Sequence, residues 1–550
     1  MARELFGLEV LTPDPIADDP SKKTWLGEEP EFPEEDIAET VETDVIVCGA
    51  GVAGVSAVRA AAENGAKVIL FEKSRSPQGR GGQFAIIGGK FLERWGMSDK
   101  SLGNEIVNFL MRDSSYRANQ RILKRFADTI GDAFDWYLEG APEDLFYQHL
   151  PTDPAPDDRK NIISLMRYPL TPNYNRYNER YPCYALTNMI RPDHKPILLG
   201  NYDLAVKTGN VSAYFSTPVK KLLRGSDGSI IGVIARTGDG KVIKALARKG
   251  VVLATGDYSG NRDMLEYYCP WAMGNRAVPC GVDDNRKPLN TGDGHRMGLW
   301  AGAKMEEGPH GAMTHCMGGA MGSAPYLLLN VHGERFMNED CPGQQLENQL
   351  NRVKGNTAWQ FFDSRWAEQI PYMPYGHGSP TEVVDSQLIK DGKIFEMLSP
   401  NDGYAAQVWL DSAVERGRAF RANTLEELFD KIGLPKDRAA ESVARYNYLV
   451  KKGSDDDFGK SGERLFLIEN PPYYASEYDR ALLLAVVSGL ESDHEARVLN
   501  YDREPIPGLY AAGNVQGSRF GADYHGTLPG ISHSMALVYG RIAGQNAAMK

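Results

Sequence analysis

A glycine motif near the N-terminus constrains the fold of this 550-residue chain more than any other feature. An apolar run over residues 45–47 leads into GAGVAG, in which Gly49, Gly51 and Gly54 have GxGxxG spacing. An alanine-rich stretch follows, and then a second apolar run that ends in Glu72. This order predicts a strand, a tight turn, a helix and a second strand, with phosphates bound at the positive end of the helix. We therefore expect a dinucleotide-binding α/β domain.

Each position of the motif has a physical role. The first glycine permits the tight turn, the second lets the backbone approach a pyrophosphate, and the third lets the helix pack closely on the strand. The carboxylate of Glu72, about 20 residues downstream, can accept hydrogen bonds from ribose hydroxyls. We also assign Ala53, within the motif, and Lys73, after the acid, to the cofactor site.

A second signature of this kind lies near the other end of the chain. Residues 506–514 read IPGLYAAGN, and residues 526–544 read GTLPGISHSMALVYGRIAG. The first segment predicts a strand that ends at a glycine, and the second predicts a Pro-Gly turn that opens an apolar helix. The helix N-terminus can meet a second polar part of the same ligand. A dinucleotide site built from both ends of a chain suits FAD better than NAD.

These two signatures and four segments between them carry a family resemblance. The four are GRGGQFAIIGGK (79–90), VVLATGDYSGN (251–261), NTGDGHRMGLWAGA (290–303) and LLLNVHGERFMNE (327–339). The chain resembles the flavoprotein family of soluble fumarate reductases, succinate dehydrogenase flavoprotein subunits and 3-ketosteroid dehydrogenases. The resemblance implies an α/β fold, in which a Rossmann-like FAD-binding domain with a β-meander carries an inserted α+β capping domain.

The expected organisation has four segments. An acidic arm spans 1–40, the FAD-binding domain spans 41–305 and 487–550, and the cap spans 306–486. Short apolar strands separated by Asp-Gly turns predict the β-meander over 217–253. The arm has twelve acidic residues against three basic ones, within a net charge of −12. We interpret it as a solvated tail, and the alternative is an arm that packs on a neighbouring subunit of a homo-oligomer.

Composition narrows the class of protein. Outside the arm the chain is nearly neutral, which gives no support for nucleic-acid binding. No apolar stretch is long enough to span a bilayer, and no secretory signal is visible. The six cysteines form no CxxC pair, so we expect free thiols in a reducing cytoplasm and no metal, haem or iron–sulfur group. A cytoplasmic enzyme for a small molecule is expected, with an external electron donor or acceptor that the sequence does not identify.

The resemblance also assigns flavin contacts. No histidine lies between residues 74 and 93, where covalent members attach the flavin, so we expect non-covalent FAD. Asn514 stands where relatives carry an acid that binds a ribityl hydroxyl, and its amide oxygen can accept the same hydrogen bond. Amides at the start of the C-terminal helix would stabilise negative charge at the flavin N1–O2 edge. The further expected FAD contacts are Gly81, Gly82, Gln83, Gly88, Gly89, Val219, Ala254, Thr255, Gly256, Gly513, Gly530, Ile531 and Ser532.

The substrate side departs from the fumarate reductases, which bind two carboxylates with arginines and histidines and use one arginine as proton donor. Ungapped matching puts Thr527 at a clamping arginine and Gly343 at the proton-donor arginine. The family's histidine pair has no counterpart in 482–490. Without these cations, little offsets the desolvation of a dicarboxylate. We therefore expect a substrate other than fumarate.

A flavin beside a pocket rich in tyrosine and methionine resembles the branch of the family that acts on a C=C bond conjugated to a carbonyl. This chemistry needs a hydrogen-bond donor to the carbonyl and a weak acid or base for the α-proton. Ketosteroid dehydrogenases use a tyrosine directly before the Pro-Gly turn, but this chain has Leu528 there. The candidate catalytic residues are Tyr524, His525, Arg519, Tyr326 and His310. For each of them a purely structural role is the competing interpretation.

We expect an ene-reductase that transfers hydride from flavin N5 to a steroid-, cinnamate- or flavonoid-like substrate. One alternative is a ketosteroid-type dehydrogenase that runs the reverse reaction with an external acceptor. Another is a flavoprotein electron-transfer subunit that needs a partner protein. NAD at the first motif is a third possibility, against which the C-terminal flavin loop argues.

Overall fold

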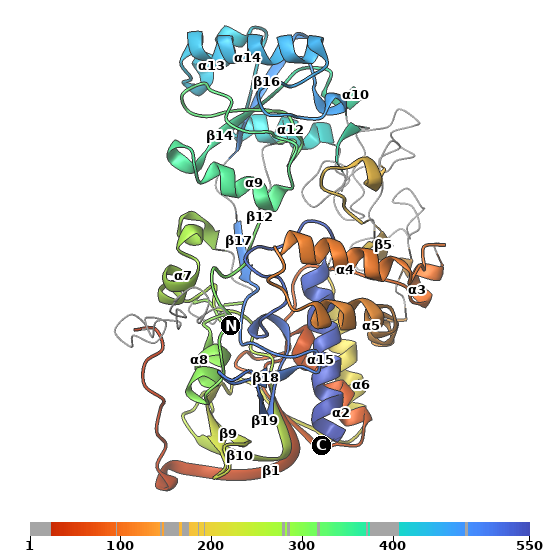
Figure 1. Cartoon of the computed structure of the whole chain (residues 1–550). Coiled ribbons are helices and arrows are strands. Elements are labelled where there is room, and N and C mark those ends of the chain that lie inside the picture. Colours follow the sequence, from red (N-terminus) through yellow and green to blue (C-terminus); the bar gives the residue numbers. More distant parts are fainter. Residues whose placement is uncertain are drawn as a thin grey trace, which may run out of the picture.

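The structure is a computed structural model that describes residues 24–94, 96–143, 146–147, 164–167, 175–184, 186–191, 193–277, 281–282, 287–315, 320–369, 372–374, 406–478 and 482–549. A larger α/β part lies below a smaller cap in Figure 1. The predicted α/β class, with a parallel sheet at its centre, is confirmed.

An eight-stranded sheet forms the core of the larger part, with the order β18-β19-β10-β1-β2-β7. Strand β1 (Ile37–Cys48) pairs in parallel with both β2 (Val68–Phe71) and β10 (Val242–Leu253). Strand β19 (Pro505–Ala511) pairs in parallel with β10, so segments from both ends of the chain meet in one sheet. The other strands are β7 (Val211–Tyr214), β8 (Val219–Arg224), β9 (Ile230–Arg236) and β18 (Arg497–Leu499).

The two faces of this sheet are covered differently. Val45 and Val47 point into a core that contains helices α2 (Val52–Glu63) and α15 (Ile531–Met549). Ile46 and Cys48 alternate with them and point into a second core. That core contains the antiparallel run β8-β9-β10, which is the predicted β-meander. The helices around the sheet are α3 (Lys90–Glu93), α4 (Leu102–Asp113), α5 (Gln120–Leu138), α6 (Lys195–Lys207), α7 (Arg262–Tyr268) and α8 (Asp293–Trp300).

Small residues let the last helix pack tightly on the first. A Cβ atom at Gly540 would lie 2.2 Å from the carbonyl oxygen of Ala53, and one at Gly544 would lie 2.2 Å from that of Ala57. Both distances are far below van der Waals contact, so only glycine permits this approach of α15 to α2. The helices lie side by side in Figure 1.

The cap is built on a four-stranded antiparallel sheet. Its order is β13 (Leu327–Leu329), β14 (Ala358–Phe362), β16 (Tyr473–Tyr478) and β15 (Ala419–Ala422). Its helices are α9 (Gly343–Leu350), α10 (Trp366–Gln369), α12 (Ala406–Glu415), α13 (Leu425–Ile432) and α14 (Lys436–Lys452).

Two antiparallel strands connect the cap to the larger part. They are β12 (Ala312–His315) and β17 (Leu482–Val486), and the short β11 (Arg276–Ala277) pairs with β17. Because these two strands pair in one ladder, the outgoing and returning segments of the chain run side by side between the larger part and the cap (Figure 1). The predicted segment boundaries at 40, 305 and 486 stay predictions.

A second four-stranded sheet extends the larger part near α4. Its order is β3 (Gln83–Ala85), β6 (Thr187–Arg191), β5 (Ser164–Arg167) and β4 (Phe146–Tyr147). The 3₁₀ turn at Arg176–Asn178 lies between β5 and β6 in the sequence.

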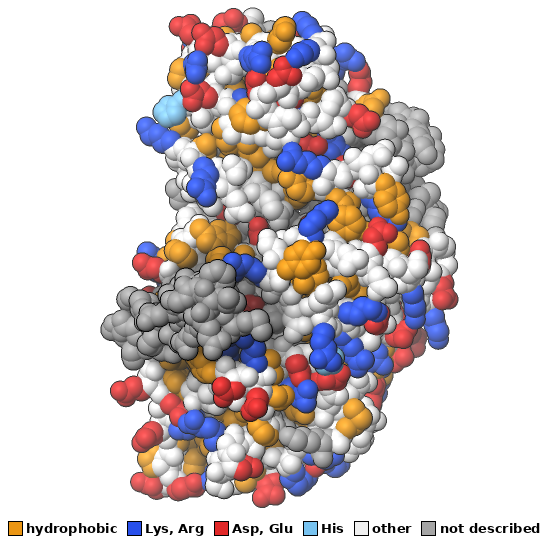
Figure 2. All heavy atoms as spheres, in the orientation of Figure 1, with side chains coloured by type: hydrophobic (Ala, Val, Ile, Leu, Met, Phe, Trp, Pro, Cys, Tyr) orange, Lys and Arg blue, Asp and Glu red, His pale blue; other side chains and the backbone are white. Residues whose placement is uncertain are grey.

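The described part of the acidic arm packs against other residues of the same chain. The Trp25 ring packs against Tyr267 and Tyr268, with centroids 5.8 and 5.4 Å away, and Glu29 pairs with Arg224 at 2.8 Å. Residues 1–23 of the predicted arm lie outside the described residues. Figure 2 shows charged side chains of both signs interspersed over the visible face. Within the described residues, no helix combines the length and apolar character needed to cross a membrane.

Candidate cofactor and substrate sites

The first glycine motif forms an open turn between β1 and α2. Gly49 has a φ of +107°, and a Cβ atom there would lie 2.3 Å from the carbonyl oxygen of Ala254. A Cβ atom at Gly54 would lie 1.8 Å from the carbonyl oxygen of Gly49. At Gly51, by contrast, a Cβ atom would meet only the carbonyl oxygen of Gln78, at 3.8 Å. Packing therefore requires the first and third glycines, whereas the second borders open space where a phosphate can approach.

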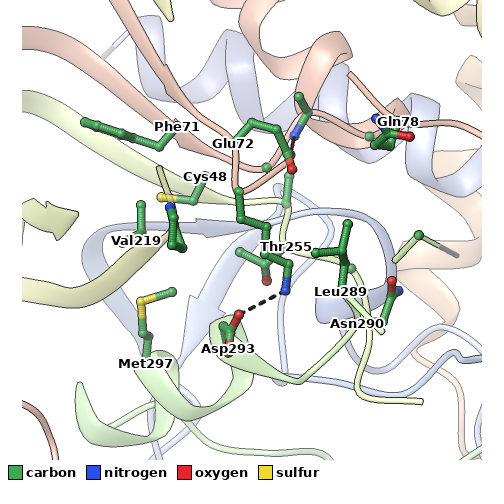
Figure 3. A pocket seen from close by; sticks show the side chains of 18 residues that line it. Cys48, Phe71, Glu72, Gln78, Val219, Thr255, Leu289, Asn290, Asp293 and Met297 are labelled. Carbon is green, nitrogen blue, oxygen red and sulfur yellow. Dashed lines mark hydrogen bonds and ion pairs between the residues drawn. The ribbon is translucent and has the colours of Figure 1, made fainter. Parts of the chain in front are cut away.

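A cavity begins at this turn and is shown in Figure 3. Glu72 lies at its wall, where Oε2 accepts a 2.6 Å hydrogen bond from the Ala50 N–H. Lys73 Nζ lies 3.1 Å from Oδ2 of Asp293 on α8. The predicted cofactor residues that line this cavity are Gly49, Gly51, Glu72, Lys73, Val219, Ala254, Thr255 and Gly256.

The C-terminal signature meets the first motif from the other side. Gly513 has a φ of +75°, and a Cβ atom there would lie 3.0 Å from the Ala53 Cβ. Gly530 has a φ of +87°, and a Cβ atom there would lie 2.8 Å from the carbonyl carbon of Gln83. The turn that precedes α15 therefore packs on β3, and the turn after β19 packs on α2.

At several other predicted flavin-contact positions, the packing or the backbone conformation of the protein itself requires glycine. A Cβ atom at Gly82 would lie 2.0 Å from the Ile190 carbonyl oxygen, and one at Gly89 would lie 2.8 Å from that of Gly131. Gly88 has a φ of +72° and packs on the Lys100 side chain. Gly81 has a φ of +69°. The contacts of these residues, Ile531 and Ser532 with the flavin stay predictions.

Several buried polar atoms near the two motifs have no partner among the described residues. They include Thr255 Oγ1, in the first cavity, and both ring nitrogens of His295, on α8. Asn514 Oδ1 accepts a 3.3 Å hydrogen bond from Arg519. An open amide turn, an acid at the end of β2 and unsatisfied polar atoms fit the phosphates, ribose and other polar groups of FAD.

A second cavity, of about 230 Å³, lies where the loop over 521–527 meets the cap, and we call it the cap cavity. Gly343 and Thr527, the two positions at which fumarate reductases carry arginines, both line it. The ionisable residues of its lining are Arg112, Asp113, Glu179, Tyr181, Cys183, Asp340, Cys341, Arg464, Asp523 and His525.

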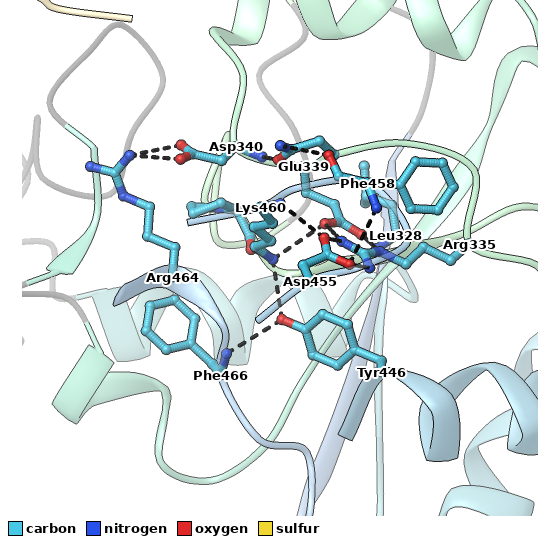
Figure 4. A network of polar contacts seen from close by, with 12 residues as sticks. Leu328, Arg335, Glu339, Asp340, Tyr446, Asp455, Phe458, Lys460, Arg464 and Phe466 are labelled. Carbon is cyan, nitrogen blue, oxygen red and sulfur yellow. Dashed lines mark hydrogen bonds and ion pairs between the residues drawn. The ribbon is translucent and has the colours of Figure 1, made fainter. Parts of the chain in front are cut away.

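One arginine of the cap cavity is fully engaged. Arg464 Nη1 donates to both carboxylate oxygens of Asp340, at 2.8 and 2.9 Å, and Figure 4 shows this pair. Its Nη2 donates to both oxygens of Glu179, at 2.7 and 2.6 Å, and its Nε donates to the Tyr372 carbonyl. No nitrogen of this guanidinium is left for a ligand carboxylate.

A buried ion network fixes the loop that carries Asp340. Arg335 donates to Glu339 Oε1 and to Asp455 Oδ2, at 2.9 and 2.8 Å, and Lys460 Nζ lies 3.3 Å from Glu339 Oε2 (Figure 4). Glu339 thus points into the cap while the adjacent Asp340 points to the cavity wall. This anchoring positions the start of α9, where the cavity is lined by Gly343.

His525 lines the cap cavity with a buried imidazole ring. Its side chain is 2% exposed, and Nε2 has no partner among the described residues. Burial lowers the pKa of His525 to about 4, so the ring is neutral at physiological pH. Thr527 Oγ1 donates to Asp113 Oδ2 nearby.

Two other candidates lie behind the cavity wall. Tyr524 is buried, its hydroxyl accepts a 3.5 Å hydrogen bond from the Ser532 N–H, and burial raises its pKa to about 12. Arg519 is fully buried and donates to the carbonyls of Gln516 and Val487, at 2.8 and 3.2 Å. Neither lines the cap cavity.

The last two candidates lie in hydrophobic surroundings. Tyr326 packs against Phe362 in the cap, and its hydroxyl donates to the Trp366 carbonyl at 3.3 Å. His310 Nδ1 lies 2.6 Å from the Tyr258 hydroxyl, and its ring stacks on Tyr268 with centroids 4.1 Å apart. Of the five candidates, the structure brings only His525 to the lining of the cap cavity, and all five roles stay predictions.

Sequence reasoning missed the charged residues of the cap cavity. Asp523 stands two residues before His525, which is a local signal that could have drawn attention to it. Glu179 and Arg464 have no such signal, because they are 285 residues apart in the sequence.

Comparisons with known proteins agree with this geometry. The sequence model of the FAD binding domain matches residues 44–534. The chain is 27% identical to vinyl phenol reductase of Lactiplantibacillus plantarum over 537 residues, which cover 92% of this chain and 96% of that protein. Its fold is similar to that of 3-ketosteroid-Δ4-(5α)-dehydrogenase from Rhodococcus jostii RHA1, with a TM-score of 0.67, 22% identity and coverage of 94% and 99%. It is also similar to the open form of a flavocytochrome c3 fumarate reductase, with a TM-score of 0.60, 23% identity and coverage of 98% and 85%.

The matched region contains the first glycine signature, the cap and the second signature as far as Ser534. The family resemblance and the FAD cofactor inferred from the sequence are thereby confirmed. The chain belongs to the FAD binding domain family, together with fumarate reductases and 3-oxosteroid dehydrogenases, and is an FAD-dependent oxidoreductase.

Proposed function

We propose that the protein is an ene-reductase that saturates a C=C bond conjugated to a carbonyl, and that its substrate is not fumarate. The observation that carries this proposal is the composition of the cap cavity. It has Thr527 where fumarate reductases carry a clamping arginine and Gly343 where they carry the proton-donor arginine, and both terminal nitrogens of Arg464 are bound by carboxylates. FAD, when bound, supplies the hydride to the substrate.

Charge balance in the cap cavity disfavours an anionic substrate. Four carboxyl groups line it against two guanidiniums. The second guanidinium, of Arg112, lies 3.4 Å from Asp113 and above the Phe109 ring, and its side chain is 54% exposed. A ligand carboxylate would therefore lose its hydration and gain little in return.

Cavity size favours a single-ring substrate. An apolar cavity of about 150 Å³ holds benzene, so about 230 Å³ accommodates a ring with a short unsaturated side chain. This supports a cinnamate-like substrate, as an ester or another neutral derivative, over a steroid. A relative named vinyl phenol reductase is consistent with a substrate of that size.

The neutral His525 ring supplies an anchoring acceptor when its proton lies on Nδ1. Its Nε2 lone pair can accept a hydrogen bond from a substrate hydroxyl. The same lone pair could accept a proton from a saturated substrate, which favours a ketosteroid-type dehydrogenase as the second candidate function.

Anaerobic reoxidation of the dithionite-reduced holoenzyme tests the proposal, with flavin absorbance as the readout. The panel holds fumarate, urocanate, a cinnamate with its methyl ester, a steroid enone and a flavonoid-type enone, and free FAD is the control. We expect rapid reoxidation by the neutral single-ring ester and none by fumarate. Reoxidation by fumarate would contradict the cavity argument. Reduction of the oxidised flavin by saturated ketones alone would instead establish the dehydrogenase.

A further inference from the structure

Asp523 differs from the other carboxyl groups of the cap cavity because no guanidinium among the described residues binds it. The other three each contact Arg112 or Arg464. In the described part of the chain, the hydrogen bonds to the Asp523 carboxyl come from amides. Asn348 Nδ2 donates to its Oδ2 at 3.1 Å, and the Tyr524 N–H donates to its Oδ1 at 2.8 Å. Amide donors hold a carboxyl in place without fixing its charge as a guanidinium does.

The location of Asp523 is as informative as its partners. It belongs to the loop that precedes α15, on the side of the cofactor motifs. Asn348, which holds it, lies on α9, the helix that begins at Gly343. Gly343, which replaces the proton-donor arginine of fumarate reductases, and the Asp523 carboxyl therefore line the same cavity.

We propose that Asp523 is the proton donor of the reduction, a role that rests on the proposed function. The β-carbon of the substrate takes a hydride from the reduced flavin, so the substrate gains two electrons and the flavin is oxidised. The α-carbon takes the proton released when the carboxyl O–H bond of Asp523 breaks. The resulting carboxylate recovers its proton from water.

The environment of Asp523 suits this role. Burial raises its pKa to about 6, and the amide hydrogen bonds oppose that shift only partly. A general acid with a pKa near the working pH combines a protonated fraction with a ready release of the proton. The titratable groups around it are His525 on its own loop, Glu347 on α9, Arg112 and Asp113 on α4, and Asp340 in the cap.

The test compares the wild-type holoenzyme with Asp523→Asn, which keeps the shape and the amide contact. The readout is the rate of flavin reoxidation by the neutral ester as a function of pH. We expect the wild-type rate to fall as the pH rises through about 6. The variant should be slower by at least about 100-fold and should lack this pH dependence. Asp502→Asn, in an exposed turn, is the matched control and should behave as the wild type.

Two measurements separate proton transfer from a structural role. Infrared difference spectra of the oxidised holoenzyme, recorded below and above pH 6, should show a protonated carboxyl band that Asp523→Asn lacks. Added formate buffer should restore part of the rate of Asp523→Ala, because formic acid can occupy the space of the missing carboxyl group and donate its proton.

The outcomes are distinguishable. A reactive wild type with an unaffected Asp523→Asn overturns this proposal alone, as does a slow variant that keeps the wild-type pH profile. A wild type that no enone reoxidises overturns the proposed function, and this proposal with it.

Discussion

The ion pair between Arg464 and Glu179 joins the cap to the larger part, and Glu179→Gln should loosen that junction. Both side chains are nearly buried, with exposures of 8% and 10%, and the pair makes two hydrogen bonds of 2.7 and 2.6 Å. Hydrogen bonds to charged groups contribute about 1.5–3 kcal/mol. Burial raises the pKa of Glu179 despite its partner, so desolvation offsets part of this gain.

We therefore expect Glu179→Gln to weaken the interaction between the cap and the larger part by about 2 kcal/mol. The loss is no greater because Arg464 keeps its contact with Asp340. Because residues of both parts line the cap cavity, ligand affinity should fall by about 30-fold. The assay is a ligand titration of the oxidised holoenzyme, followed by the change in flavin absorbance. Glu463→Gln removes an exposed neighbouring charge and is the control. Equal affinity of the two variants, within about twofold, would refute the reasoning.

Three further predictions concern the cofactor, the helix packing and pH. Glu72→Gln should weaken FAD binding by about 10- to 100-fold, measured by flavin fluorescence, because a charged acceptor for ribose hydroxyls is lost. Gly544→Leu should lower the thermal unfolding midpoint sharply and release FAD, since its Cβ atom would lie 2.2 Å from the Ala57 carbonyl oxygen. Burial raises the pKa of Glu306 from 4.5 to about 7, so its folded form binds more protons and stability falls as the pH rises between those values. Glu306→Gln should flatten the urea-unfolding free energy over that range, and an unchanged slope would count against the assignment.

The cofactor side was predictable because its determinants are local in the sequence. Glycine spacing, an apolar run and a terminal acid occupy about 30 residues, and the structure builds the turn, helix and strands that they imply. The sequence alone did not show why some of the other positions must be glycine. Gly82 and Gly89 face the backbone of residues more than 40 positions away, so their packing depends on the tertiary fold.

The substrate side was less predictable for the same reason. His525 could be found because it stands beside a recognisable motif. The partners of Asp523 and Arg464 come from α9, from the loop before α9 and from the segment before β6, and no pattern in the sequence pairs them. Tyr524 satisfies the sequence argument for a weak acid, but its ring packs on Phe520, with centroids 5.3 Å apart, inside the core.

The close packing of α15 on α2 has a consequence for biosynthesis. Helix α2 emerges early from the ribosome, with Val52 through Ala62 destined for burial, whereas its partner α15 is translated more than 450 residues later. At ordinary elongation rates this delay lasts tens of seconds, during which the face of α2 that packs on α15 has no native cover. Flavin loading must therefore follow synthesis of α15, and the nascent chain should depend on chaperones that shield this face.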